Sequence, residues 1–123
     1  MADPIAPIIE KDPNVSTVCV GQTLTITITS PGSGGSGTCT DEYRYSTNNG
    51  GTWTAWSTTV PNFVAVAGTS LVESRRNCNG GGCASNINQL SWIVITDPIA
   101  PVIVKSPNVA SVCEGQTISI TVT

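Results

Sequence analysis

The chain contains no histidine, and charged residues make up only 11% of its 123 residues. Histidine is the usual general base near neutral pH and a frequent zinc ligand, so its absence removes the commonest catalytic and metal-binding arrangements. No pair of carboxylates is placed by a recognisable hydrolase motif either. We therefore expect a protein that is not an enzyme and that holds no metal and no cofactor.

Positive charge and long apolar runs are also scarce. Lys and Arg total 5 and the net charge is −3, so no basic surface is available for nucleic acid. No apolar run reaches the roughly 18 residues of a membrane-spanning helix, so we expect no membrane insertion. Met1 and Ala2 lack the features of a signal peptide, and we interpret them as residues added by cloning. A secretion signal is then expected upstream.

One segment of the sequence occurs twice. Residues 3–29 read DPIAPIIEKDPNVSTVCVGQTLTITIT, and residues 97–123 read DPIAPVIVKSPNVASVCEGQTISITVT. The two copies align without a gap and are identical at 18 of 27 positions, at a constant offset of 94 residues. A unit that starts again where it ends is typical of a tandem array. We predict one complete repeat over 3–96 and the first two strands of the next repeat over 97–123.

The two copies differ at positions that matter for a metal site. Asp3, Glu10 and Asp12 lie near the first repeat boundary and Asp97 lies at the next, where carboxylates can ligate calcium and stiffen a joint between domains. The counterparts of Glu10 and Asp12 in the second copy are Val104 and Ser106, which cannot replace two carboxylate ligands. The comparison favours an architectural role for the repeated segment.

Alternating apolar and polar residues predict strands. Residues 23–29 alternate strictly, so Leu24, Ile26 and Ile28 are expected on one buried face and the threonines on the other. In the strand predicted over 61–67, Phe63 and Val66 are available to the core. No stretch of the chain shows helical periodicity.

Turn signals divide these strands at short intervals. The NNGG sequence at 48–51 supplies residues that tolerate positive φ and predicts a tight hairpin. Strands are expected at 42–46, 52–56, 61–67, 70–78 and 89–96. Short strands in a repeat of this length predict an all-β fold, a two-sheet antiparallel sandwich of immunoglobulin or fibronectin-III type.

The chain has five cysteines, and four of them fall within one repeat. Cys19, Cys39, Cys78 and Cys83 belong to one repeat, and Cys113 is the counterpart of Cys19. Four cysteines in a histidine-free repeat favour disulfides in an oxidising compartment over a zinc site. In the predicted sandwich, Cys39 bonds to Cys78 or to Cys83. Cys19 lies at the opposite end, and a bond within its repeat or to the following repeat stays open.

Arginines occupy two neighbouring positions of one predicted strand. Arg75 and Arg76 point in opposite directions because successive side chains of a strand alternate. We expect one of them to form an ion pair with Glu42 or Glu73 and the other to face the solvent.

Aromatic residues over 43–56 offer an alternative function. Trp53 and Trp56 could stack on a sugar ring in a carbohydrate-binding or cell-adhesion site. On a strand, however, residues three apart point to opposite faces, so at least one of the two rings is expected in the core. The pattern favours packing over ligand stacking.

Three segments resemble a known family: CVGQTLTITIT, YRYSTNNGGTWTAW and SLVESRRNCNGGGCASNINQLSWIVI. They are similar to the immunoglobulin-like repeats of very large bacterial surface proteins, which are adhesin-like and often secreted by the type IX route. The resemblance covers the whole repeat, and its motifs are structural. It implies an extracellular spacer or filament module that associates head-to-tail with neighbouring repeats at a bacterial cell surface.

The second copy leaves two explanations open. Its two strands carry an apolar face, and the strands that would cover this face follow it in a longer natural chain. Alternatively, residues 97–123 dock where residues 3–29 of another molecule belong and produce strand-exchanged head-to-tail fibres.

Overall fold

The structure, a computed structural model, describes residues 3–79 and 85–123. These residues form strands and no helix, so the prediction of an all-β fold is confirmed, and none of them belongs to an apolar helix that could cross a membrane. In chain order the strands are β1 (Ile8–Asp12), β2 (Thr17–Cys19), β3 (Thr23–Ser30), β4 (Cys39–Ser46), β5 (Asn62–Val64), β6 (Gly68–Cys78), β7 (Asn88–Ile95), β8 (Ile103–Ser106) and β9 (Ser119–Val122).

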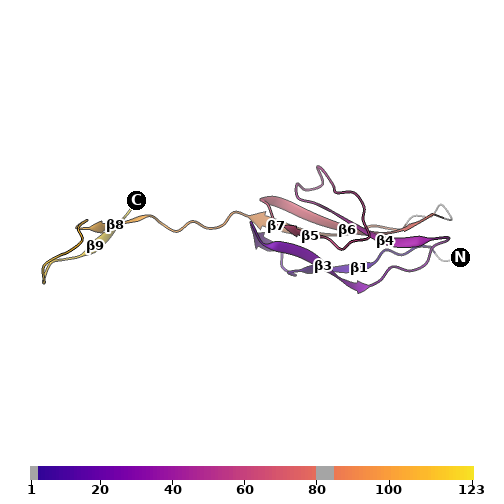
Figure 1. The fold of residues 1–123 in the computed structure, drawn as a ribbon, viewed down its shortest axis with the longest axis horizontal. Coiled ribbons are helices and arrows are strands. Elements are labelled where there is room, and N and C mark those ends of the chain that lie inside the picture. Colours follow the sequence, from indigo (N-terminus) through magenta and orange to yellow (C-terminus); the bar gives the residue numbers. More distant parts are fainter. Residues whose placement is uncertain (1–2, 80–84) are drawn as a thin grey trace.

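Strands β1 to β7 form two sheets with one core between them (Figure 1). One sheet has the order β1-β3-β5 and the other has the order β2-β7-β6-β4. All pairs are antiparallel except β2 and β7, which are parallel, so the prediction of a purely antiparallel sandwich is wrong at this pair. The chain crosses from one sheet to the other between Asp12 and Thr17, and β2 lies beside β7 with both strands running in the same direction.

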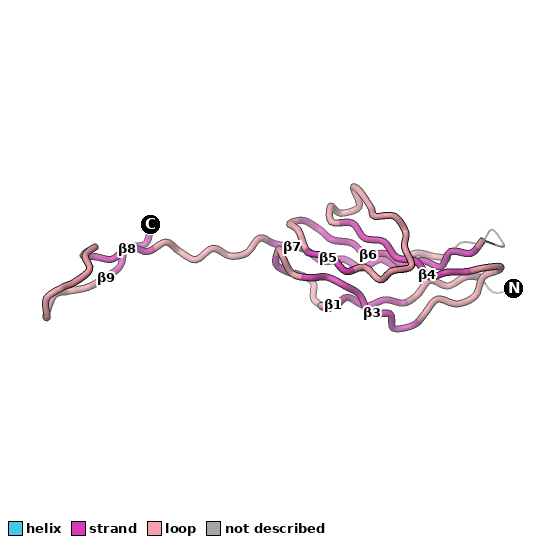
Figure 2. The backbone as a smooth tube through the Cα atoms, in the orientation of Figure 1, coloured by secondary structure: helices cyan, strands magenta, loops and turns pink. Residues whose placement is uncertain are grey.

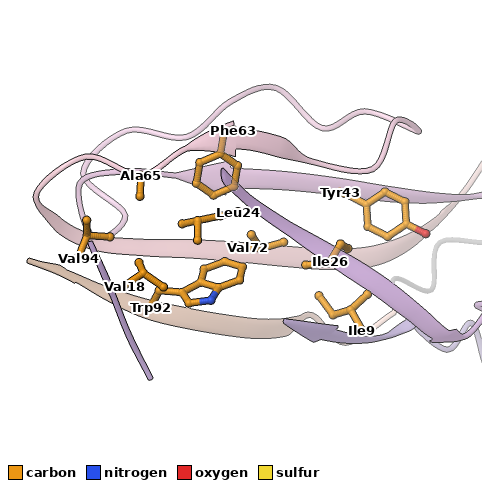
Figure 3. Close-up of a cluster of buried hydrophobic side chains, with 10 residues drawn as sticks. All are labelled: Ile9, Val18, Leu24, Ile26, Tyr43, Phe63, Ala65, Val72, Trp92 and Val94. Atoms are coloured by element: carbon orange, nitrogen blue, oxygen red, sulfur yellow. The ribbon is translucent and has the colours of Figure 1, made fainter. Parts of the chain in front are cut away.

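The core combines side chains from both sheets (Figure 3). Trp92 is fully buried at its centre, and its indole Nε1 donates a hydrogen bond of 2.9 Å to the carbonyl oxygen of Pro13. The ring of Phe63 meets Trp92 edge-on at 6.4 Å and stacks on Tyr45 at 4.0 Å. Burying an apolar side chain of this size contributes about 1.5–3 kcal/mol, so this cluster is the main source of stability in the sandwich.

Two residues predicted for the core are exposed instead. Leu24 and Ile26 are buried as expected, but Ile28 is 38% exposed because it lies beyond the part of β3 that pairs with β5. Phe63 and Ala65 point inward on β5 and just after it, so Val66, one residue further, points outward and is 46% exposed. The alternation of the strand excludes Phe63 and Val66 from the same face.

The turn after β4 follows the prediction from its sequence. Asn49 and Gly50 have positive φ values of 58° and 85°, the conformation that asparagine and glycine tolerate best. The hydroxyl oxygen of Ser46 accepts a hydrogen bond of 2.9 Å from the amide of Gly50. The sequence therefore identified the place and the chemistry of this reversal.

The segment that returns along β4 is irregular, whereas a regular strand over 52–56 was predicted. The Thr54 amide donates to the Tyr45 carbonyl oxygen, and Ser57 exchanges two backbone hydrogen bonds with Tyr43. Three residue steps on the returning segment thus match two steps on β4, which is a bulge of one residue. An extra residue reverses the alternation of side chains beyond it.

The second copy forms a separate β8–β9 hairpin away from the sandwich (Figures 1 and 2). Lys105 pairs with Ile120 in this hairpin, as Lys11 pairs with Ile26 in the first copy. The register is therefore the same, but Ile26 is 6% exposed and Ile120 is 59% exposed. The repeated segment adopts its strand pairing without the core that covers it in the sandwich.

Candidate binding surface

A disulfide bond joins β4 to β6 at the N-terminal end of the sandwich. Cys39 and Cys78 are direct partners in the register of β4 and β6, with a Cα–Cα distance of 4.1 Å. This is one of the two bonds that the sequence allowed for Cys39, and the other candidate partner, Cys83, lies outside the described residues. Cys19 and Cys113 are exposed free thiols in the structure.

The two tryptophans lie with two arginines on the outer face of the β4–β6 pair. The guanidinium of Arg44 lies over the rings of Trp53 and Trp56, at 4.3 and 4.5 Å from their centroids. Arg75 lies over Trp56 at 4.2 Å. Neither ring belongs to the core, so the prediction that at least one does is wrong, and the bulge in the returning segment explains why both lie on one face.

Carboxylates neutralise both arginines of this cluster. Arg44 forms an ion pair of 2.7 Å with Glu73, and Arg75 forms one of 2.8 Å with Glu42. Glu73 is only 7% exposed, and its second oxygen accepts a hydrogen bond of 2.8 Å from the side-chain amide of Gln89. We call Trp53, Trp56, Arg44, Arg75, Glu42 and Glu73 the Trp–Arg cluster.

The neighbouring arginine is also paired, which corrects the expectation that one of the two faces the solvent. Arg76 lies 2.8 Å from Asp41 and donates a second hydrogen bond of 2.9 Å to the carbonyl oxygen of Gly34. Its partner is directly opposite it in the register of β4 and β6. Each arginine of β6 thus has an acidic residue across from it.

The Trp–Arg cluster has the properties of a structural brace. Its two positive and two negative side chains cancel, so it presents no unpaired charge for an anionic ligand. A guanidinium lies over each ring, so a sugar cannot stack on that face of the ring. Cation–π contacts of this kind are worth about 0.5–2 kcal/mol each, and here they hold the irregular segment after the turn against the sheet.

A small groove of about 280 Å³ lies beside this segment, between β4 and the residues that lead into β5. Tyr43, Tyr45, Val60 and Pro61 are among the residues that line it. Burial, and to a lesser extent the charge of Asp41, raises the pKa of the Tyr43 phenol above its ordinary value of 10.0. A phenol with a raised pKa stays protonated at neutral pH, so Tyr43 is a poor general base.

No metal centre is visible in the part of the chain that the structure describes, because no three His, Cys, Asp or Glu side chains gather there. A comparison with protein-family models and one with curated proteins found no match to this chain. The features that bear on function are the repeat, the disulfide and the Trp–Arg cluster.

Replacing Arg44 with Ala should lower the free energy of unfolding by about 2 kcal/mol, because Glu73 loses its partner in a buried position and both rings lose a cation. Tryptophan emission should shift to the red as Trp53 and Trp56 gain solvent. Urea titration followed by fluorescence measures both effects.

Arg76→Ala is the matched control, since Arg76 pairs with Asp41, whereas the cations over the two rings are Arg44 and Arg75. This variant should lose stability without the shift in emission. An unchanged emission spectrum in Arg44→Ala would contradict the packing that we describe for the two tryptophans.

Proposed function

We propose that residues 3–96 are one immunoglobulin-like repeat of a tandem array that serves as a spacer or adhesive stalk at a bacterial cell surface. The observation that carries this proposal is the second copy, whose hairpin has the register of the first copy but no core of its own. A segment that forms the same pairing after a constant offset is the expected opening of another sandwich.

Three features support an extracellular and mechanical role. The Cys39–Cys78 bond suits an oxidising compartment. Every arginine of the sandwich is engaged by a carboxylate, and the Trp–Arg cluster braces the most irregular segment. The proposed role is mechanical and includes no catalytic step.

The proposed partners are neighbouring copies of the repeat. Within one array, the opening strands of each repeat are covered by the strands that follow them. In the present chain, the exposed β8–β9 hairpin can instead replace β1 and β3 of a second molecule. Its apolar residues stand at the positions that β1 and β3 bury in the core. Such strand exchange would join molecules head-to-tail.

Carbohydrate binding through Trp53 and Trp56 is less well supported, because Arg44 and Arg75 lie on the rings. Titration of the protein with soluble cell-wall oligosaccharides, followed by tryptophan fluorescence, tests this alternative. The spacer proposal expects no saturable change, and a saturable change that Trp53→Ala abolishes would favour the carbohydrate-binding function.

The array proposal is tested by a longer chain in which Thr123 is followed by a second copy of residues 30–96. We expect this two-repeat chain to contain two folded sandwiches, with about twice the unfolding enthalpy of the single one by calorimetry. Small-angle scattering should show an elongated particle. A second half that stays unfolded would show that residues 97–123 do not open a repeat.

A further inference from the structure

The joint between consecutive repeats is very short. Strand β7 ends at Ile95, and Pro98 is the counterpart of Pro4, which is buried against the first sandwich. Only Thr96 and Asp97 lie between these two points. Three residue steps span at most about 11 Å, so a second sandwich anchored at Pro98 begins almost in contact with the first.

The first repeat shows how firmly this opening segment is anchored. Ile5 exchanges two backbone hydrogen bonds with Ser33, of 2.7 and 3.1 Å. The carbonyl oxygen of Pro7 accepts hydrogen bonds of 2.8 Å from the Ser74 hydroxyl and 2.9 Å from the Asn88 side chain. Ala6 and Pro7 are buried. The opening segment is therefore part of the sandwich and does not lengthen the joint.

Apolar side chains gather where the chain leaves the first sandwich. Val20, Val66 and Ile95 are 37%, 46% and 48% exposed there, and we call these three residues the exit patch. Backbone hydrogen bonds of 2.9 Å from Val20 to Ile95 and from Gly21 to Ala65 hold their three segments together. Figure 1 shows this end of the sandwich, from which the chain after β7 departs.

The opposite end of a sandwich suits this patch. Its loop over 30–37, SPGSGGSG, carries no charge. Asp41 and Arg76 nearby are paired with each other. Ile5 is 54% exposed in this region, and its counterpart Ile99, two residues after the joint, is 93% exposed. Among its described residues, the N-terminal end thus offers a loop without charge, a paired Asp and Arg, and one exposed apolar side chain, with an acidic residue only in the joint itself.

We infer that the exit patch is the binding surface for the N-terminal end of the following repeat, with Ile99 packed against it. This inference rests on the proposed array and adds how its units are coupled. A two-residue joint without glycine has little freedom of its own, and covering the patch removes apolar surface from water. At this joint the two sandwiches are then held stiffly in contact.

The two-repeat chain described above tests the inference by nuclear magnetic resonance. Amide exchange of Val20, Gly21 and Ile95 in its first repeat should be about tenfold slower than in the 123-residue chain. Relaxation rates should report one shared rotational correlation time for both repeats. Independent tumbling of two folded repeats, with unchanged exchange at these amides, would overturn the interface while the array stands.

A matched pair of variants locates the contact. Ile95 and Ile87 are both 48% exposed, but Ile87 precedes β7 at the other end of the sandwich. Ile95→Asp in the two-repeat chain should restore fast exchange and independent tumbling, and Ile87→Asp should leave both unchanged. Equal effects of the two variants would overturn the inference. An unfolded second repeat would overturn the array itself and the interface with it.

Discussion

Replacing both Cys39 and Cys78 with Ser should lower the free energy of unfolding by about 4 kcal/mol. The bond closes a loop with a sequence separation of 39 residues, and the chain-entropy relation assigns about this value to a loop of that length. For a domain of this size, such a loss corresponds to a fall of roughly 15–30 °C in the melting temperature.

Urea titration of the oxidised protein and of the double variant, without reductant, measures the difference. Cys19→Ser is the control, since this exposed free cysteine should change the free energy by less than about 0.5 kcal/mol. A double variant as stable as the parent protein would show that the bond is absent or is replaced by another one. Because a spacer exposed to proteases depends on its folded lifetime, this bond is central to the proposed role.

Replacing Ile26 with Ala should destabilise the protein by about 3 kcal/mol, because the removed methyl groups leave a cavity in the core. The same change at Ile120, its counterpart in the second copy, should cost less than about 0.5 kcal/mol. The two side chains are identical and each is paired with a lysine in the same register, but they are 6% and 59% exposed. Chemical denaturation of the two single variants measures the contrast.

This pair of variants also decides whether molecules exchange strands. In a strand-exchanged fibre, Ile120 is buried in the core and Ile26 is exposed to solvent. Ile120→Ala then becomes the variant with the larger loss of stability. Light scattering after size exclusion reports the accompanying mass. A monomer in which only Ile26→Ala is destabilising shows that the first copy stays in its own sandwich, and a large assembly in which only Ile120→Ala is destabilising shows exchange.

The proposed coupling of the repeats would give the Trp–Arg cluster a mechanical role. The proposed rod of sandwiches would transmit force through each unit, and the irregular segment after β4 is hydrogen-bonded to the sheet at few points. The arginines clamp this segment through ion pairs and aromatic contacts. We expect these contacts to contribute most to keeping the segment on the sheet when the protein is under tensile load.

Local patterns in the sequence determined the fold class, the repeat and the position of most strands. Alternation of apolar residues and the chemistry of the NNGG turn are properties of neighbouring residues, so they can be read without the fold. The repeat needed only a comparison of two segments. For the Cys39–Cys78 bond, the predicted order of strands placed Cys39 at one end of the sandwich. Cys78 and Cys83 both remained as its possible partners.

Only the tertiary structure decided which faces the functional candidates share. The bulge beside β4 places Trp53 and Trp56 on one face, and the register of β4 and β6 gives each arginine its carboxylate. The parallel pairing of β2 depends on the chain crossing between sheets. These features arise from contacts between residues far apart in the chain. A single inserted residue also moves every later side chain of a strand to the opposite face. The alternation of one strand alone therefore cannot determine them.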